Sequence, residues 1–238
     1  MKLIAKNNQW KRTTAAFSLI TALLGGCALP EKPQRATLYD FGPGLVATAP
    51  STRLAPLPPI SLAEVDASPA FDGNAVLYRL AYTDANQLRP YAQARWSMPP
   101  AQLVHQRLRT ALSQRRAVLG ADEASALATP DGARPRILRV DVEEFSHLFD
   151  APEKSNGLVR LRATLLEATP AGEKLLAQRS VIVQRPAASG DAPGGVRALA
   201  DATEAAVQEL QQWLDTVPVA AGAGVRGNPL TAAPARQP

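Results

Sequence analysis

Three segments that alternate between apolar and polar residues constrain the fold of this chain more than any other feature. They cover residues 137–143, 158–165 and 175–183. In the first, Leu138, Val140 and Val142 would lie on one face of a strand, with charged residues on the other. The links 150–157 and 169–173 have the length and composition of hairpin connections. The pattern therefore predicts an antiparallel meander with one face available to helices.

The alternation changes phase within the first of these segments. After Glu143 and Glu144, the alternating apolar set becomes Phe145, His147 and Phe149. Because side chains in a strand repeat every two residues, a shift by one residue would turn the apolar face outward unless a residue were inserted. The sequence therefore predicts a β-bulge at this point.

The remaining elements are predicted from shorter signals. Strands are expected at residues 60–65 and 75–82, with a brief edge strand within 86–95 and a first short strand within 38–43. Ser97 and Pro99-Pro100 suit the start of a helix running to about Arg116, with Trp96 in the core at its entry. Residues 189–195 break the chain, and a last amphipathic helix follows from Val196. This order predicts an α+β fold: a mainly antiparallel sheet with two principal helices packed on one side.

The N-terminus has the pattern of an export signal. Residues 1–26 contain four basic residues and no acid, with a run of about 12 apolar residues that ends at Leu24 and is followed by Gly25-Gly26. The only cysteine of the chain, Cys27, follows at once. Removal of residues 1–26 leaves 22 basic against 21 acidic residues, so most of the formal net charge of +5 belongs to the signal. The remaining chain lacks the basic surplus typical of nucleic-acid-binding proteins.

The segment Leu24-Gly25-Gly26-Cys27 resembles the lipobox of bacterial lipoproteins. This resemblance implies that Cys27 is the lipid attachment site, carrying a diacylglyceryl thioether and an N-acyl chain such as palmitate. Ala28 in place of an aspartate implies the outer membrane, on its periplasmic face. Three buried acyl chains are enough for stable anchoring. An ordinary secretory signal followed by an unmodified cysteine is the alternative.

Composition predicts four parts in the chain. Residues 1–26 form the signal peptide, and residues 27–56 form a Pro-rich tether that is lipid-anchored and contains the first short strand. Residues 57–216 form the α+β domain. Residues 217–238, rich in Ala, Gly and Pro, are expected to be a disordered tail, so both ends of the domain are flanked by disordered Pro/Ala-rich sequence.

Few residues offer catalytic chemistry. His105 is expected on the first helix without a second ligand four residues on, and His147 is expected at the rim of the bulged strand. Asp141 and Glu143 share a strand face, so they could act as a pair in general acid–base catalysis. Their alternation with apolar residues is explained more simply if they lie on the solvent-exposed face of the sheet. No phosphate-binding glycine motif occurs. We therefore predict that the chain is not an enzyme and uses no cofactor or metal.

Several short motifs together resemble a known family. They include Leu57-Pro-Pro-Ile-Ser-Leu-Ala-Glu-Val65, Val76-Leu-Tyr-Arg79, Arg89-Pro-Tyr91 and Ala94-Arg-Trp-Ser-Met-Pro-Pro100. With the lipobox and Leu38-Tyr-Asp-Phe-Gly-Pro43, the arrangement over residues 37–215 resembles the ABC-type transport auxiliary lipoprotein family, which includes the paraquat-inducible protein C-like lipoproteins. The glutamate pair at the phase change and the long Ala/Pro tail have no match in the family pattern.

The resemblance implies an accessory role in mammalian-cell-entry (MCE) type ABC transport, which moves phospholipid or other lipids across the periplasm. The expected partners are an MCE-domain protein and, through it, an ABC permease and ATPase on separate chains. Assembly of this chain into a homo-oligomer is left as an open alternative. The family contributes no catalytic residues. Two alternatives remain: a stand-alone periplasmic lipid-binding carrier lipoprotein, and a hydrolase in which both histidines and the Asp141/Glu143 pair would converge.

Overall fold

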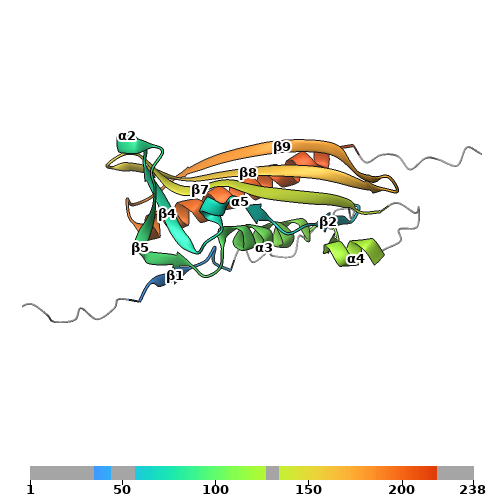
Figure 1. The fold of residues 1–238 in the computed structure, drawn as a ribbon, viewed down its shortest axis with the longest axis horizontal. Helices are drawn as coiled ribbons and strands as arrows, with labels where there is room; N and C mark the ends of the chain where they lie inside the picture. The colour runs from blue at the N-terminus through green and yellow to red at the C-terminus, as the bar shows by residue number, and fades with distance from the viewer. Residues whose placement is uncertain (1–34, 44–56, 127–133, 219–238) are drawn as a thin grey trace, which may run out of the picture. The chain divides into compact units, whose positions relative to one another are not determined.

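The computed structural model describes residues 35–43, 57–126 and 134–218, and its elements are shown in Figure 1. The predicted signal peptide, Cys27, most of the predicted tether and residues 219–238 lie outside these ranges. Among the described helices, none combines the length and the apolar character needed to cross a membrane.

The predicted meander is confirmed, and its strands are longer than expected. β7 (Arg136–Ala151), β8 (Lys154–Thr169) and β9 (Gly172–Pro186) pair antiparallel in chain order. They run side by side across Figure 1. The predicted link 150–157 is wrong, since most of it belongs to these strands. Polar residues continue the ladder there, and Asn156 Nδ2 donates to Asp150 Oδ2 at 2.8 Å.

The predicted bulge is also confirmed. In the pairing of β7 with β8, Val142 faces Leu161 and Glu144 faces Arg160, so Glu143 is the extra residue on β7. The insertion returns the apolar residues to the inner face, where Phe145 is 2% exposed. The phase change in the sequence therefore records an inserted residue rather than a change of buried face.

Short strands pair in parallel along the other side of β7. They are β2 (Ile60–Leu62), β3 (Asp66–Ala67) and β4 (Ala75–Leu80), with β6 (Val118–Leu119) beyond β2. Along the chain, a 3₁₀ turn at Pro69–Phe71 precedes β4, and the one-turn helix α2 (Ala81–Asp84) follows it. α2 replaces the end of the strand predicted for 75–82.

The sheet is completed by β5 (Leu88–Trp96) and β1 (Thr37–Tyr39). β5 pairs antiparallel with β4 and parallel with β1, so the prediction of a brief edge strand within 86–95 is wrong. β5 has nine residues and is paired on both sides. Its many polar side chains gave no alternating pattern from which this length could be predicted. The predicted first short strand is confirmed as β1, and it forms the edge of the sheet opposite β9.

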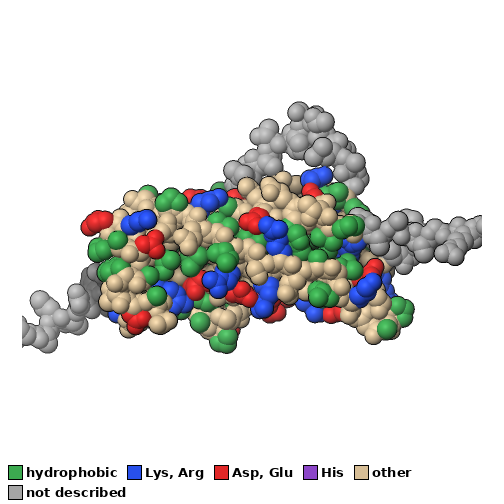
Figure 2. All heavy atoms as spheres, turned by 90° about the horizontal axis from the view of Figure 1, so that it is seen from above, with side chains coloured by type: hydrophobic (Ala, Val, Ile, Leu, Met, Phe, Trp, Pro, Cys, Tyr) green, Lys and Arg blue, Asp and Glu red, His purple; other side chains and the backbone are tan. Residues whose placement is uncertain are grey.

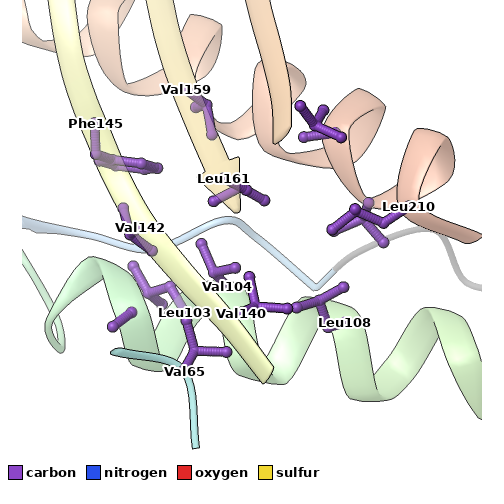
Figure 3. Packing of buried hydrophobic residues seen from close by; sticks show 14 of the residues in the cluster. Val65, Leu103, Val104, Leu108, Val140, Val142, Phe145, Val159, Leu161 and Leu210 are labelled. Atoms are coloured by element: carbon purple, nitrogen blue, oxygen red, sulfur yellow. The ribbon is translucent and has the colours of Figure 1, made fainter. Parts of the chain in front are cut away.

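Two long helices pack on one face of the sheet, which confirms the α+β class. α3 (Pro100–Leu112) contacts β7, and α5 (Ala192–Thr216) covers β8 and β9; the short α4 (Ala121–Ala126) lies near β2. Figure 3 shows side chains from α3, β7, β8 and α5 meeting in one core. Burial is complete at its centre, where Val104, Leu108 and Leu210 are 0% exposed.

Both helix starts differ from the prediction. The residue before α3 is Pro99, and the backbone N–H of the predicted cap Ser97 instead donates to the carbonyl of Tyr39 at 2.7 Å. α5 begins at Ala192, within the predicted break, and includes Gly194 and Gly195 in its first turn. A Cβ atom on Gly194 would overlap the carbonyl of Ser189, just before the helix, whereas a Cβ atom on Gly195 would overlap His147 on β7.

Candidate functional site

His147 lies at the centre of an aromatic cluster, which is defined here as Tyr78, Tyr91, His147 and Phe149. The Tyr91 hydroxyl and His147 Nδ1 are 2.8 Å apart and hydrogen-bonded. The ring centroids of His147 and Phe149 are 4.4 Å apart, and those of Tyr78 and Tyr91 are 4.6 Å apart. The predicted rim position of His147 is wrong, because its side chain is 0% exposed.

The first turn of α5 is what encloses His147. A Cβ atom on Gly195 would overlap the ring at Nδ1, so the helix backbone rests directly on the imidazole. On β8, a Cβ atom on Gly157 would overlap the backbone of Ala198. Both contacts require the smallest residue, because the helix approaches the sheet too closely for a side chain. The glycine pair directly before the apolar helical pattern, which was interpreted as a chain break, was the sequence signal for the contact at Gly195.

Burial sets the charge state of the cluster. Desolvation lowers the pKa of His147 to about 4, while the carboxylate of Asp191 acts in the opposite direction. Desolvation, followed by the nearby Tyr78, raises the pKa of the Tyr91 hydroxyl. Hydrogen bonds from Ser189 Oγ and the Gly194 N–H lower the pKa of Asp191. At neutral pH, therefore, a neutral imidazole packs beneath the first turn of α5, which Asp191 caps.

His147 Nε2 has no hydrogen-bond partner in the described part of the chain, and neither has the Ser146 hydroxyl. Nδ1 is occupied by Tyr91, and both ring nitrogens are shielded from solvent. In this arrangement the imidazole holds the helix on the sheet and offers no open face to a substrate.

The carboxylates near the bulge lie on the opposite face of β7. Arg162 on β8 contacts both members of the predicted pair, with Nε 3.5 Å from Asp141 Oδ2 and Nη2 2.9 Å from Glu143 Oε1. Glu144 makes a bidentate pair with Arg79, at 3.1 Å and 3.4 Å. The contacts of Arg162 with Asp141 and Glu143 are cross-strand ion pairs of the kind expected on a solvated sheet surface, whereas the pair of Arg79 with Glu144 is part-buried.

The structure does not bring the predicted catalytic candidates together. His105 is half-buried on α3, His147 lies in the core, and Asp141 and Glu143 point away from that core. Within the described ranges, no three His, Cys, Asp or Glu side chains are placed to hold a metal ion. Trp96, expected in the core, is 1% exposed.

A small cavity lies between the segment after β1 and α3. Its volume is about 190 Å³, and its lining includes Phe41, Met98, Leu103 and Arg107. Typical small-molecule pockets measure about 300–1,000 Å³. The Arg107 guanidinium is engaged next to the cavity, donating from Nη2 to the Phe41 carbonyl at 2.7 Å with Nη1 3.6 Å from Glu204 Oε2. Arg107 therefore holds the segment after β1 against α3 and α5.

Charges of both signs are interspersed on the face drawn in Figure 2. This matches the near balance of basic and acidic residues after the predicted signal. That face presents no block of one sign that would attract a highly charged partner.

Comparison with solved structures supports the fold. The chain is similar to protein XCC0632 from Xanthomonas campestris, with 20% identity, a TM-score of 0.57, and coverage of 75% of this chain and 94% of that one. A second similar structure, described as an uncharacterized protein, has 14% identity and a TM-score of 0.52, covering 76% of this chain and 99% of that one. At these identities the likeness shows the fold alone.

No curated protein matches this chain in sequence. The family model described as ABC-type transport auxiliary lipoprotein component matches residues 39–211. The match begins in β1, ends within the last two turns of α5, and so includes the sheet, both long helices and the buried aromatic cluster. The chain therefore belongs to the family of ABC-type transport auxiliary lipoprotein components.

Proposed function

We propose that this chain is an outer-membrane lipoprotein, acylated at Cys27, that serves as the docking component of an MCE-type ABC system for phospholipid transport across the periplasm. The observation that carries the proposal is the position of Cys27. The only cysteine of the chain ends a signal-like segment and directly precedes a domain of the transport auxiliary lipoprotein family. Ala28 after the cysteine is the basis for assigning the outer membrane.

We further propose a non-catalytic role. In support, Asp141 and Glu143 are both engaged by Arg162, and His147 is enclosed by α5. ATP hydrolysis and lipid movement through the inner membrane are then tasks of other chains. The stand-alone lipid carrier is the alternative function. The cavity described beside α3, at about 190 Å³, is below the range of small-molecule pockets and does not by itself supply a lipid site.

The anchor is tested by Cys27→Ala, produced with its signal in a Gram-negative host. The expected result is movement of the protein from the outer-membrane fraction of a density gradient to the soluble periplasmic fraction. A wild-type chain that sediments with the inner membrane would contradict the outer-membrane assignment. A stable, exported Cys27→Ala protein that remains in the membrane fraction would contradict the anchor.

Docking is tested by producing the full chain together with the membrane proteins encoded next to it. The chain is then affinity-purified from detergent-solubilised envelope. An MCE-domain protein that co-purifies with the tagged chain, and is absent with an untagged one, is the expected result. Recovery of bound phospholipid without any transport component would favour the carrier instead. The same purification is carried out with Cys27→Ala. A partner that still co-purifies with this variant is bound by the domain, whereas one that is lost was held only through the shared membrane.

A further inference from the structure

The first described segment, residues 35–43, is fixed to the rest of the domain. Three contacts fix the first described segment: the Ser97 N–H donates to the Tyr39 carbonyl at 2.7 Å, the rings of Phe41 and Trp96 meet edge to face at 5.6 Å, and Arg107 binds the Phe41 carbonyl. β1 also pairs with β5 over Thr37–Tyr39. The described fold therefore includes β1 from Thr37 onward, within the stretch 27–56 where a first short strand was expected.

This start limits how far the domain can lie from the proposed anchor. Ten residue steps separate Cys27 from Thr37, and a chain spans at most about 3.3–3.6 Å per residue, so the reach is at most about 35 Å in any conformation. A tether over the whole of 27–56 would have reached about 100 Å. For comparison, the 16 residues of β7 extend about 53 Å. The permitted reach is thus shorter than the sheet itself.

Three exposed aliphatic side chains lie on the two outermost strands of the sheet. Leu38 on β1 is 68% exposed, and on β9 Leu175 and Ile182 are 59% and 56% exposed. β1 and β9 form opposite edges of the sheet. Only the β1 edge continues directly into the segment that leads to Cys27.

We propose that the β1 edge, with Leu38 foremost, lies against the phospholipid bilayer that holds the anchor, and that the β9 edge faces away from it. The inference rests on the proposed acylation of Cys27. A link this short keeps Leu38 at an effective concentration near the bilayer in the millimolar range. At that concentration, weak partitioning of an exposed leucine into the interface is enough to orient the domain.

Matched cysteine variants test this orientation. In acylated protein the Cys27 sulfur is in a thioether, so Leu38→Cys or Leu175→Cys supplies the one free thiol for a nitrobenzoxadiazole label. Both positions are exposed to a similar degree, so neither change disturbs the core. The labelled full chain is placed in phosphatidylethanolamine–phosphatidylglycerol vesicles containing a lipid with a nitroxide on its headgroup.

The label at position 38 is expected to lose about half of its fluorescence or more, as for a side chain at the headgroup level, and the label at position 175 to lose little. Ile182→Cys is a second control on β9 and should behave like Leu175→Cys. Equal quenching at positions 38 and 175, or stronger quenching at 175, would overturn the orientation.

Mass spectrometry of the N-terminal peptide separates the two proposals. Acyl chains on Cys27 together with equal quenching would overturn only the orientation. An N-terminus without acyl chains would overturn the anchor and the orientation together.

Discussion

Acidification is expected to destabilise the domain through His147. Burial beneath α5 lowers the pKa of this imidazole to about 4, against about 6.5 in an unfolded chain. Between these two values the unfolded chain binds a proton that the folded protein does not, so stability falls as pH falls. The stabilising effect of the neutral imidazole is therefore complete above pH 6.5 and is lost progressively toward pH 4. The groups facing the ring are Tyr91 from β5, Tyr78 from β4 and Asp191 at the start of α5.

The size of the effect follows from the two pKa values. Relative to pH 7.5, the loss is about 1.4 kcal/mol at pH 5.5 and about 2.5 kcal/mol at pH 4.5. The limit at lower pH is about 3.4 kcal/mol, at 1.36 kcal/mol for each pH unit between the values. Carboxylates also titrate toward pH 4, so the change from pH 7.5 to pH 5.5 isolates the histidine best.

The assay is equilibrium urea unfolding of the purified protein at pH 7.5 and 5.5, followed by circular dichroism. The test variant carries Tyr91→Phe and His147→Phe together, because replacing both hydrogen-bond partners by apolar rings leaves neither partner unsatisfied. Its free energy of unfolding should lose about 1.4 kcal/mol less than wild type over this pH range. Tyr82→Phe, at an exposed tyrosine outside the aromatic cluster, is the matched control and should keep the wild-type pH dependence. If wild type and the double variant differed by less than about 0.5 kcal/mol in this pH effect, the reasoning about His147 would be refuted.

Two further changes test the contacts that fix the helices. Gly157→Ala should cost about 1–3 kcal/mol or more in urea unfolding, because its Cβ would overlap the backbone of α5, whereas Gly73→Ala meets nothing within 4 Å and should change stability by less than about 0.5 kcal/mol. Equal stability of these two variants would contradict the close approach of α5. Arg107→Met should cost about 2 kcal/mol and speed amide hydrogen exchange in β1, because the Phe41 carbonyl loses a charged donor. Exposed Arg109→Met on the same helix should have neither effect, and unchanged exchange in Arg107→Met would show that other contacts hold the segment.

Local periodicity predicted the parts of the fold in which one face is buried. The meander, the bulge at Glu143 and the apolar faces of α3 and α5 were all found where the pattern placed them. Strand ends were predicted poorly, because backbone pairing continues through polar residues such as Asn156 once the neighbouring strand is in place. The family resemblance, too, could be drawn from short motifs alone, and the match over residues 39–211 confirms it.

The sequence by itself determined the α+β class, the single cysteine ahead of the domain and the near neutrality of the chain beyond the predicted signal. Only the tertiary structure decided that His147 is enclosed rather than at a rim, that Asp141 and Glu143 face away from it, and that β1 brings the start of the domain within ten residues of Cys27. The physical reason is the distance along the sequence over which each property is determined. Alternation and helical spacing record which face of an element is buried, whereas the pKa of His147, the need for Gly157 and Gly195, and the pairing of β1 depend on residues far away along the chain.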